Sequence, residues 1–464
     1  MESQRAKSPI RVKFGTAGIR GLFGQDVSLR ETIAVCFAVH QLLGEGRFGL
    51  GYDTRKSSFI LGQMACSAMN WYGSDVDLYG VIPTPVLAFN IKRNRLHAGF
   101  SVTASHNPPE YAGVKVFGTD GIEFSLEAEH EIEELIQKSA NYMKREEELV
   151  NFGATFENDE AISSYRESVL KNAVPAKKKL HVLVDCGNGT SVGVTPSILS
   201  ELGHRVVTVN SHQSPTFPGR LPEPNGQTLQ EVARFSRSIG VDFTIAHDGD
   251  ADRLVMIDEV GRIVPDYAVS ALILKIVLEK VKRGIVIMSV NSSDALERIA
   301  TDSGCRVVRS RLGKTFQELY QRRGIFATEP GKMVDPRWGY WEDGIYAAVM
   351  VSQYISELGV SLSSVLESIP KYYNYQHNLK MSSALDSMLA KELIGKQFGG
   401  GVELEELDGI KVRFKDGRGW FMLRSSGTER KARVYVESSS ESDAKRILGY
   451  AVSIATASEA VRSS

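Results

Sequence analysis

The sequence predicts an α/β protein with several domains. Apolar segments of strand length end repeatedly in polar, glycine-bearing loops, and helix-like segments follow several of these loops, as at 48–58, 181–190 and 284–294. Strands that alternate with helices form parallel or mixed sheets. The chain of 464 residues is also too long for one core, because a domain usually contains about 100–200 residues. We therefore expect roughly three to four domains by length.

Composition excludes several classes of protein. Hydrophobic residues make up 42% of the chain and charged residues 24%, which is ordinary for a folded globular protein. The net charge of −1 offers no basic field for nucleic acid. Apolar runs are too short to span a membrane, and the amino-terminal segment lacks the apolar core of a signal peptide. We therefore expect a cytoplasmic protein that binds neither nucleic acid nor membranes.

The cysteines indicate a reducing compartment. They lie far apart in the sequence and show no CxxC spacing, so neither a disulfide framework nor a zinc site is favoured. We expect buried free thiols at all of them: Cys36, Cys66, Cys186 and Cys305.

Three connecting segments suggest where the domains meet. A charged stretch at 144–160 looks like a helix end and a linker, a new unit begins near Asp258, and 368–380 looks like a connector. Beyond this connector, two strand-like segments and a helical tail follow. The expected domains are therefore 1–150, 151–254, 255–370 and 371–464.

The first candidate loop for chemistry is TASHNP. Ser105 follows an apolar strand, His106 and Asn107 come next, and Lys115 lies ten residues after the serine. A serine at such a place can carry a phosphoryl or acyl group if a cation stabilises the charge. An ordinary polar turn before Pro108 is the alternative. No GxSxG motif is present, so a hydrolase triad is not favoured.

The second loop is AHDGDADR, which follows another apolar strand. Asp248, Asp250 and Asp252 occupy alternate positions and would repel one another without a cation. Carboxylate oxygens suit Mg²⁺ or Ca²⁺. An EF-hand is excluded because Arg253 stands where that motif requires glycine. The metal site is favoured over a solvated acidic turn.

The remaining loops offer groups that bind anions and hydroxyls. In LRSSGTERK, a guanidinium, hydroxyls and a glycine turn could cradle a phosphate, although a hairpin turn explains the segment equally well. In ATEPGK, Glu329 and Lys332 follow a short strand, and a surface loop is the simpler interpretation. Arg20 lies in the glycine-rich segment KFGTAGIRG, which alone indicates little.

In this order, the loops resemble those of the α-D-phosphohexomutase superfamily, which includes phosphomannomutases, phosphoglucomutases and phosphoglucosamine mutases. The resemblance runs from FGTAGIRG through TASHNPPEYAGVKVF and AHDGDADR to RSSGTERKARVYVE, and so covers nearly the whole chain. It implies a heart-shaped enzyme of four domains. Three domains would share an α/β topology, and the C-terminal α+β domain would resemble the TATA-binding protein. Each domain would contribute one loop to a central cleft.

The resemblance also implies roles for individual residues. Ser105 would carry a phosphoryl group, and Asp248, Asp250 and Asp252 would bind Mg²⁺, which also touches the phosphoserine. Other matching residues would line the reaction centre, select the sugar or hold its phosphate. These are Arg20, Lys115 and Arg253 for the centre, Glu329 with Lys332 for the sugar, and Arg424, Ser426, Gly427 and Thr428 for the phosphate.

The implied reaction is the interconversion of a hexose 6-phosphate and a hexose 1-phosphate. Ser105 would donate its phosphoryl group, a hexose 1,6-bisphosphate would turn over in the cleft, and the other phosphoryl group would return to Ser105. Lys115 would act as general acid or base, a task that His106 or Arg20 could share. The bisphosphate would also serve as activator, and a homodimer is a possible assembly.

The sugar loop departs from the family pattern. Many relatives show Glu-x-Ser-Gly-His, whereas Glu329 here is followed by Pro330, Gly331 and Lys332. The Glu-Pro start resembles the archaeal phosphoglucosamine mutases, so we expect a glucosamine phosphate as substrate. A phosphomannomutase/phosphoglucomutase is the alternative. A non-catalytic paralogue that binds sugar phosphates is a second alternative, from a different class, and a structural Ca²⁺ site is the remotest one.

Overall fold

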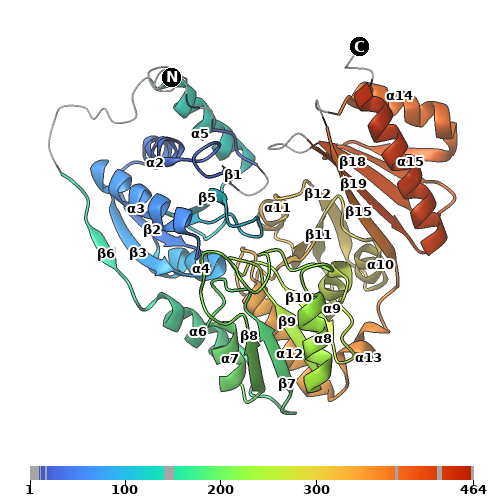
Figure 1. Cartoon of the computed structure of the whole chain (residues 1–464), viewed down its shortest axis with the longest axis horizontal. Coiled ribbons are helices and arrows are strands. Elements are labelled where there is room, and N and C mark those ends of the chain that lie inside the picture. The colour runs from blue at the N-terminus through green and yellow to red at the C-terminus, as the bar shows by residue number, and fades with distance from the viewer. Residues whose placement is uncertain are drawn as a thin grey trace.

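The computed structural model describes residues 10, 12–15, 18–139, 151–381, 385–425 and 431–460. They form three mixed α/β sheets and one antiparallel sheet, and Figure 1 shows the resulting four domains in chain order around the molecule. The predicted architecture of α/β domains followed by a C-terminal α+β domain is confirmed. In the described part of the chain, no helix is both long and apolar enough to cross a membrane.

Domain I is built on a six-stranded sheet with the order β1-β5-β4-β2-β3-β6. The central strands β4, β2 and β3 are parallel, whereas β5 is antiparallel to both β1 and β4. Strand β4 is buried along its whole length, so its polar C-terminal loop emerges from the core. The elements are β1 (Ile19–Leu22), α2 (Leu29–Leu43), β2 (Arg47–Tyr52), α3 (Lys56–Trp71), β3 (Asp75–Val81), α4 (Thr84–Asn94), β4 (Ala98–Val102), β5 (Tyr111–Gly118), α5 (Leu126–Lys138) and β6 (Thr155–Glu157).

Domain II carries a four-stranded sheet with the order β10-β9-β7-β8. Strand β7 is parallel to β8 and β9, and β10 returns antiparallel to β9. The tight β9–β10 connection therefore places the acidic loop at the C-terminal end of β9. The elements are α6 (Ala161–Asn172), β7 (His181–Asp185), α7 (Thr195–Glu201), β8 (Arg205–Val209), α8 (Gln230–Ile239), β9 (Phe243–Ala246) and β10 (Val255–Asp258).

Domain III repeats this plan with the strand order β12-β11-β13-β14, where only β14 is antiparallel to its neighbour. Most side chains of α9 and α12 are buried, which explains their largely apolar sequences. The elements are α9 (Asp266–Lys280), β11 (Ile285–Ser289), α10 (Asp294–Asp302), β12 (Arg306–Ser310), α11 (Thr315–Arg322), β13 (Phe326–Glu329), β14 (Lys332–Val334), α12 (Gly344–Leu358) and α13 (Leu362–Leu366).

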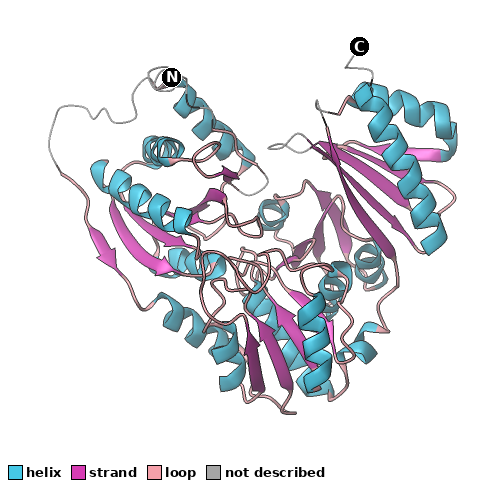
Figure 2. Cartoon of the chain, in the orientation of Figure 1, coloured by secondary structure: helices cyan, strands magenta, loops and turns pink. Residues whose placement is uncertain are grey.

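Domain IV is an antiparallel sheet with the order β15-β19-β18-β17-β16. Figure 2 shows two long helices, α14 and α15, covering one face of this sheet. The elements are β15 (Tyr373–Lys380), α14 (Ser387–Phe398), the 3-10 turn η1 (Gly399–Gly401), β16 (Val402–Glu405), β17 (Ile410–Phe414), β18 (Trp420–Ser425), β19 (Lys431–Ser438) and α15 (Glu441–Ala460).

The apolar cores differ in how they connect the domains. One continuous cluster contains Ile91 of domain I, Ile245 of domain II and Leu272 of domain III, so these domains share buried apolar contacts. Domain IV has a core of its own and meets domain III through a small cluster at Val290 and Trp420. The cysteines are buried free thiols, as predicted.

Candidate active site

The backbone around Ser105 is held in an uncommon conformation by buried polar groups. Ser105 has a φ of +50°, a region that non-glycine residues seldom adopt. Its N–H donates to Thr103 Oγ1 at 2.8 Å, and its carbonyl accepts from Arg55 at 3.0 Å. Arg55 also pairs with Asp53, which accepts from Thr103 Oγ1 at 2.7 Å. These contacts fix the loop so that the serine side chain faces the acidic loop of domain II.

The Ser105 hydroxyl connects domains I and II. Its Oγ donates to Asp248 Oδ2 at 2.7 Å. His106 Nδ1 lies 3.4 Å from Ser105 Oγ. Burial, with the nearby charges of Arg253 and Arg20, lowers the pKa of His106 well below its usual value. The imidazole is therefore neutral near pH 7 and can accept a proton.

The three aspartates of the β9–β10 loop form a buried site suited to a cation. Asp248, Asp250 and Asp252 each offer an oxygen within 4.8 Å of the others. Asp250 Oδ1 and Asp252 Oδ1 are buried and have no hydrogen-bond partner among the residues that the structure describes. Unpartnered buried carboxylate oxygens are costly unless a cation binds them. The donor set consists of oxygen alone, so these residues fit Mg²⁺.

Lys115 balances the charge of the aspartates from the interior of domain I. Its Nζ lies 2.8 Å from Asp252 Oδ2, 3.1 Å from Asp250 Oδ2 and 3.7 Å from Glu123 Oε1. Burial disfavours its charged form, but these carboxylates outweigh that effect and raise the pKa of Lys115 well above its usual value. The side chain is therefore an ammonium group at neutral pH, beside the predicted metal ligands.

Lys332 occupies a similar place and is directed there by a tight hairpin. Strands β13 and β14 pair Glu329 with Lys332, and the two-residue turn uses Gly331 at a φ of +76°, which glycine tolerates at little cost. Lys332 Nζ lies 2.9 Å from Asp252 Oδ2 and pairs with Glu342. The lysine predicted to bind sugar therefore contacts the acidic loop of domain II.

Glu329, predicted to select the sugar, is also engaged by the protein. Its carboxylate accepts from Gly313 N at 2.7 Å and from Thr315 Oγ1 at 2.8 Å, at the start of α11. Burial raises the pKa of Glu329. Glu329 still lines the cleft, but several of its acceptor positions are already filled.

A cleft of about 680 Å³ runs between these loops. Arg20 reaches it from β1 and donates to Asn107 Oδ1 at 3.0 Å. Arg253 Nε lies 3.9 Å from Asp248 Oδ2. The residues predicted from the sequence that line this cleft are Arg20, Ser105, His106, Arg253, Glu329 and Lys332.

Domain IV contributes cations to the same cleft. Lys431 and Arg433 of β19 line it, whereas Arg424, predicted to hold phosphate, pairs with Asp408 at 3.0 Å. The other predicted phosphate-binding residues lie outside the described residues. They are Ser426, Gly427 and Thr428.

Several residues of the site were not predicted from the sequence. Thr84 Oγ1 donates to Asp250 Oδ2 at 2.8 Å, and Glu342 pairs with Lys332. Thr84 lies in no recognisable polar loop motif, whereas Glu342 lies in the segment 327–344 that contains Glu329, but no role was predicted for Glu342. Asp53 and Arg55 could have been predicted from the sequence, because these charged residues directly follow a largely buried strand.

Comparison with known proteins shows to which family these domains belong. Family models described as phosphoglucomutase/phosphomannomutase alpha/beta/alpha domains I, II and III match residues 11–143, 163–261 and 265–373, and the model of the C-terminal domain matches residues 384–452. The probable phosphoglucosamine mutase of Methanopyrus kandleri is 34% identical over 94% of this chain and 95% of that protein. The phosphopentomutase of Thermococcus kodakarensis is 36% identical over 92% of this chain and 94% of that protein.

Solved structures share the fold. A putative phosphomannomutase from Thermus thermophilus superposes with a TM-score of 0.81 at 22% identity, covering 95% of this chain and 98% of that one. The N-acetylphosphoglucosamine mutase of Aspergillus fumigatus, solved with GlcNAc-6P and magnesium, gives a TM-score of 0.57 at 15% identity, covering 96% of this chain and 95% of that one. Because the family models match all four domains in order, this chain belongs to the phosphoglucomutase/phosphomannomutase superfamily of phosphohexomutases.

Proposed function

We propose that this protein is a phosphoglucosamine mutase, which interconverts glucosamine 6-phosphate and glucosamine 1-phosphate through phosphorylated Ser105. Among its relatives, proteins of Methanopyrus kandleri and Methanococcus vannielii, 34% and 32% identical over nearly the whole chain, are named probable phosphoglucosamine mutase and phosphoglucosamine mutase. The Glu-Pro sequence at Glu329 is consistent with the same substrate.

One observation carries the proposal. The hydroxyl of Ser105 points at Asp248, at 2.7 Å, beside two aspartates that have free buried oxygens. A binding protein needs no serine hydroxyl at a predicted metal site, whereas a phosphoryl carrier requires both. When bound there, Mg²⁺ would supply positive charge to neutralise the phosphoryl group.

The proposed cycle consists of two transfers. In the first, a sugar hydroxyl oxygen bonds to the phosphorus as the bond from phosphorus to Ser105 Oγ breaks. A base takes the hydroxyl proton, and an acid returns a proton to Ser105 Oγ. In this cycle His106, whose Nδ1 lies 3.4 Å from Ser105 Oγ, takes the role of base, and the ammonium of Lys115 takes the role of acid. After the bisphosphate turns over in the cleft, the reverse step moves its other phosphoryl group to Ser105.

Arg20 and Arg253 would hold the moving phosphoryl group. Both line the cleft beside Ser105, and guanidinium groups bind phosphate oxygens in a bidentate manner. Lys431 and Arg433 face the same cleft from domain IV and suit the phosphate that is not reacting. The cleft therefore has positive groups on opposite sides, as a substrate that turns over requires.

A pentose phosphate is the second candidate substrate, because the phosphopentomutase of Thermococcus kodakarensis is 36% identical to this chain. Ribose 5-phosphate, in its furanose form, lacks the amino group of glucosamine and has one ring carbon fewer. The two candidates therefore differ in the groups that the walls of the cleft must recognise.

The test is a mutase assay with Mg²⁺ and glucose 1,6-bisphosphate. The substrates are the 6-phosphates of glucosamine, glucose and mannose, and ribose 5-phosphate. We expect the largest kcat/KM for glucosamine, a phosphoryl group on Ser105 by mass spectrometry, and no activity for Ser105→Ala. Ser352→Ala is the matched control, since Ser352 is buried in α12 and its hydroxyl donates to the carbonyl of Ala348 in the same helix. Activity retained by Ser105→Ala would contradict the mechanism, and a preference for another sugar would contradict the substrate.

A further inference from the structure

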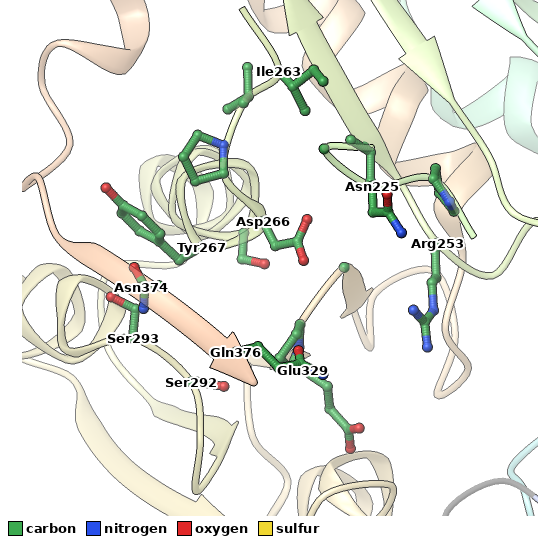
Figure 3. Close-up of a pocket in the computed structure, with 18 of the residues that line it drawn as sticks. Asn225, Arg253, Ile263, Asp266, Tyr267, Ser292, Ser293, Glu329, Asn374 and Gln376 are labelled. Carbon is green, nitrogen blue, oxygen red and sulfur yellow. The ribbon is translucent and has the colours of Figure 1, made fainter. Parts of the chain in front are cut away.

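A second cavity, of about 650 Å³, adjoins the reaction cleft where domains II, III and IV meet (Figure 3). Its walls come from the 223–226 loop, the start of α9, the 291–293 loop and strand β15. It shares part of its wall with the cleft, so a ligand in one space can contact residues that also line the other. The shared residues include Glu223, Arg253, Asp266, Asn291, Glu329 and Gln376.

The ionised side chains of this cavity are mostly negative. Its carboxylates belong to Glu223, Asp266 and Glu329, and its cation is Arg253. Glu329 is engaged by Gly313 and Thr315, whereas the side chains of Glu223 and Asp266 have no ion pair with any described residue. Figure 3 shows the Asp266 carboxylate pointing into the open space, with Arg253 on the far side. The two carboxylates are therefore available to a ligand.

Few cationic side chains of the described residues lie near these carboxylates. Burial of the Asp266 carboxyl raises its pKa. Arg253 lowers this pKa, and Glu223 raises it further. Arg253 is itself close to Asp248, at 3.9 Å. A cationic group entering the cavity would therefore be stabilised by both carboxylates, and a phosphate group would be repelled.

Asn291 provides an independent sign that the cavity receives a ligand. Its side chain is more than nine-tenths buried, at 8% exposure, and lines both the cavity and the cleft. Its Oδ1 accepts from Ser289 Oγ at 2.8 Å, but its amide nitrogen has no partner among the described residues. The amide nitrogen is therefore free to donate a hydrogen bond to a ligand in the space that Asn291 lines.

We propose that this cavity recognises the amino group of the substrate, with Asp266 and Glu223 binding the ammonium of a hexosamine phosphate and Asn291 donating to a neighbouring sugar hydroxyl. The inference rests on the proposed function, which it deepens by assigning the residues that distinguish an aminosugar from a neutral sugar. Phosphate groups stay in the cleft beside Arg20, Lys431 and Arg433, so the amino group and the phosphate groups occupy spaces of opposite charge.

The test compares Asp266→Asn, Glu223→Gln and the double variant with the wild-type protein. The measured quantity is kcat/KM for glucosamine 6-phosphate divided by that for glucose 6-phosphate. A hydrogen bond to a charged group contributes enough that we expect this ratio to fall about tenfold for each single variant and further for the double variant. The value for glucose 6-phosphate should fall less, because a neutral hydroxyl interacts with a carboxylate more weakly than an ammonium group does.

Glu231→Gln is the matched control. Glu231, like Asp266, is an acidic residue in the first turn of a helix, but it lines neither space, so its substitution should leave the ratio unchanged. Thermal unfolding checks that each variant folds. If Asp266→Asn did not fold, Glu223→Gln, which changes a loop residue, would still decide the question.

The outcomes separate the two proposals. An unchanged ratio in folded variants of an enzyme that converts glucosamine 6-phosphate overturns the inference and leaves the proposed function intact. Equal losses for both sugars also overturn it, because they indicate a general role in binding or folding. A wild-type protein that converts other sugars but no glucosamine phosphate overturns the proposed function, and the inference with it.

Discussion

Two buried lysines show how differently two regions of this molecule treat the same side chain. Lys115, in the reaction centre, and Lys411, at the junction of domains III and IV, are each 1% exposed. Lys115 contacts Asp250, Asp252 and Glu123. Lys411 donates to the carbonyl of Val290 at 2.6 Å and lies 4.1 Å from the centre of the Trp420 ring.

Burial disfavours the charged form of both lysines, so the difference between their pKa values comes from the groups around them. Burial opposes the ammonium form in both places, but the carboxylates raise the pKa of Lys115 well above its usual value. At Lys411, burial dominates and lowers the pKa to about 7, with Arg309 adding to the effect. A carbonyl and an aromatic ring stabilise a cation less than ionised carboxylates do. The reaction centre therefore holds a fixed charge, and the junction holds one that titrates.

The largest effect is expected for Lys115→Met. The change leaves buried Asp250 without its cation and Asp252 with Lys332 alone, which costs about 3–5 kcal/mol of unfolding free energy for a broken buried pair. Loss of the proposed acid should also lower mutase activity by about 10²- to 10⁴-fold. Urea unfolding at pH 7 and steady-state kinetics measure the two effects.

Lys138→Met is the control for that experiment. Lys138 pairs with Glu134 at 2.8 Å, but both side chains are more than half exposed, and surface pairs contribute about 0–1 kcal/mol. Adding Mg²⁺ should restore part of the stability of Lys115→Met, since a divalent cation can replace the lost ammonium. Equal stability of the two variants would show that the aspartates are not charged in the folded protein.

An intermediate effect is expected for Lys332→Met. Lys332 lies 2.9 Å from Asp252 and pairs with Glu342, so its removal takes away a repelling cation and leaves Glu342 uncompensated. Both changes should make the aspartate site bind Mg²⁺ several-fold more tightly, by about 1 kcal/mol. Calorimetric titration of the unphosphorylated protein measures this affinity. Lys332→Arg keeps the charge and should keep the affinity, and weaker binding by Lys332→Met would contradict this role.

The fold class and the loops that form the site could be predicted from the sequence. The strand–loop–helix order gave the α/β class, and polar loops at the ends of buried strands indicated the site, since Ser105 and the aspartates follow β4 and β9. These are local patterns of hydrophobicity and turn chemistry. The four-domain assignment itself depended on the resemblance, because periodicity alone does not count sheets.

Contacts between distant residues could not be predicted from the sequence. The bond from Ser105 to Asp248 spans 143 positions, and that from Lys332 to Asp252 spans 80. The direction of Lys332 is set by the two-residue turn of its hairpin, and a turn one residue longer would shift the register. The roles of Ser105, Lys115 and the aspartates in catalysis stay predictions.

The smallest effect at neutral pH, and the one with the clearest pH signature, is expected for Lys411→Met. The pKa of Lys411 is about 7 in the folded protein and returns to about 10.4 on unfolding. Between these values the unfolded chain binds more protons, so the unfolding free energy of the wild-type protein rises with pH. Relative to the variant, it should rise by up to about 1.4 kcal/mol per pH unit from about pH 7 to 10.

Below about pH 7 both states of the wild-type protein hold the proton, so its difference from Lys411→Met should become constant there. Under those conditions the variant should be as stable as the wild type or more stable, because methionine fills the site without a buried charge. Lys396→Met is the matched control, since Lys396 is 69% exposed on α14 of the same domain. Parallel pH curves for Lys411→Met and the wild type would mean that burial, Arg309 and Arg413, which disfavour the ammonium, are fully offset by Asp294 and Glu405. The junction would then hold a fixed charge as the reaction centre does, and the contrast between the two regions would fail.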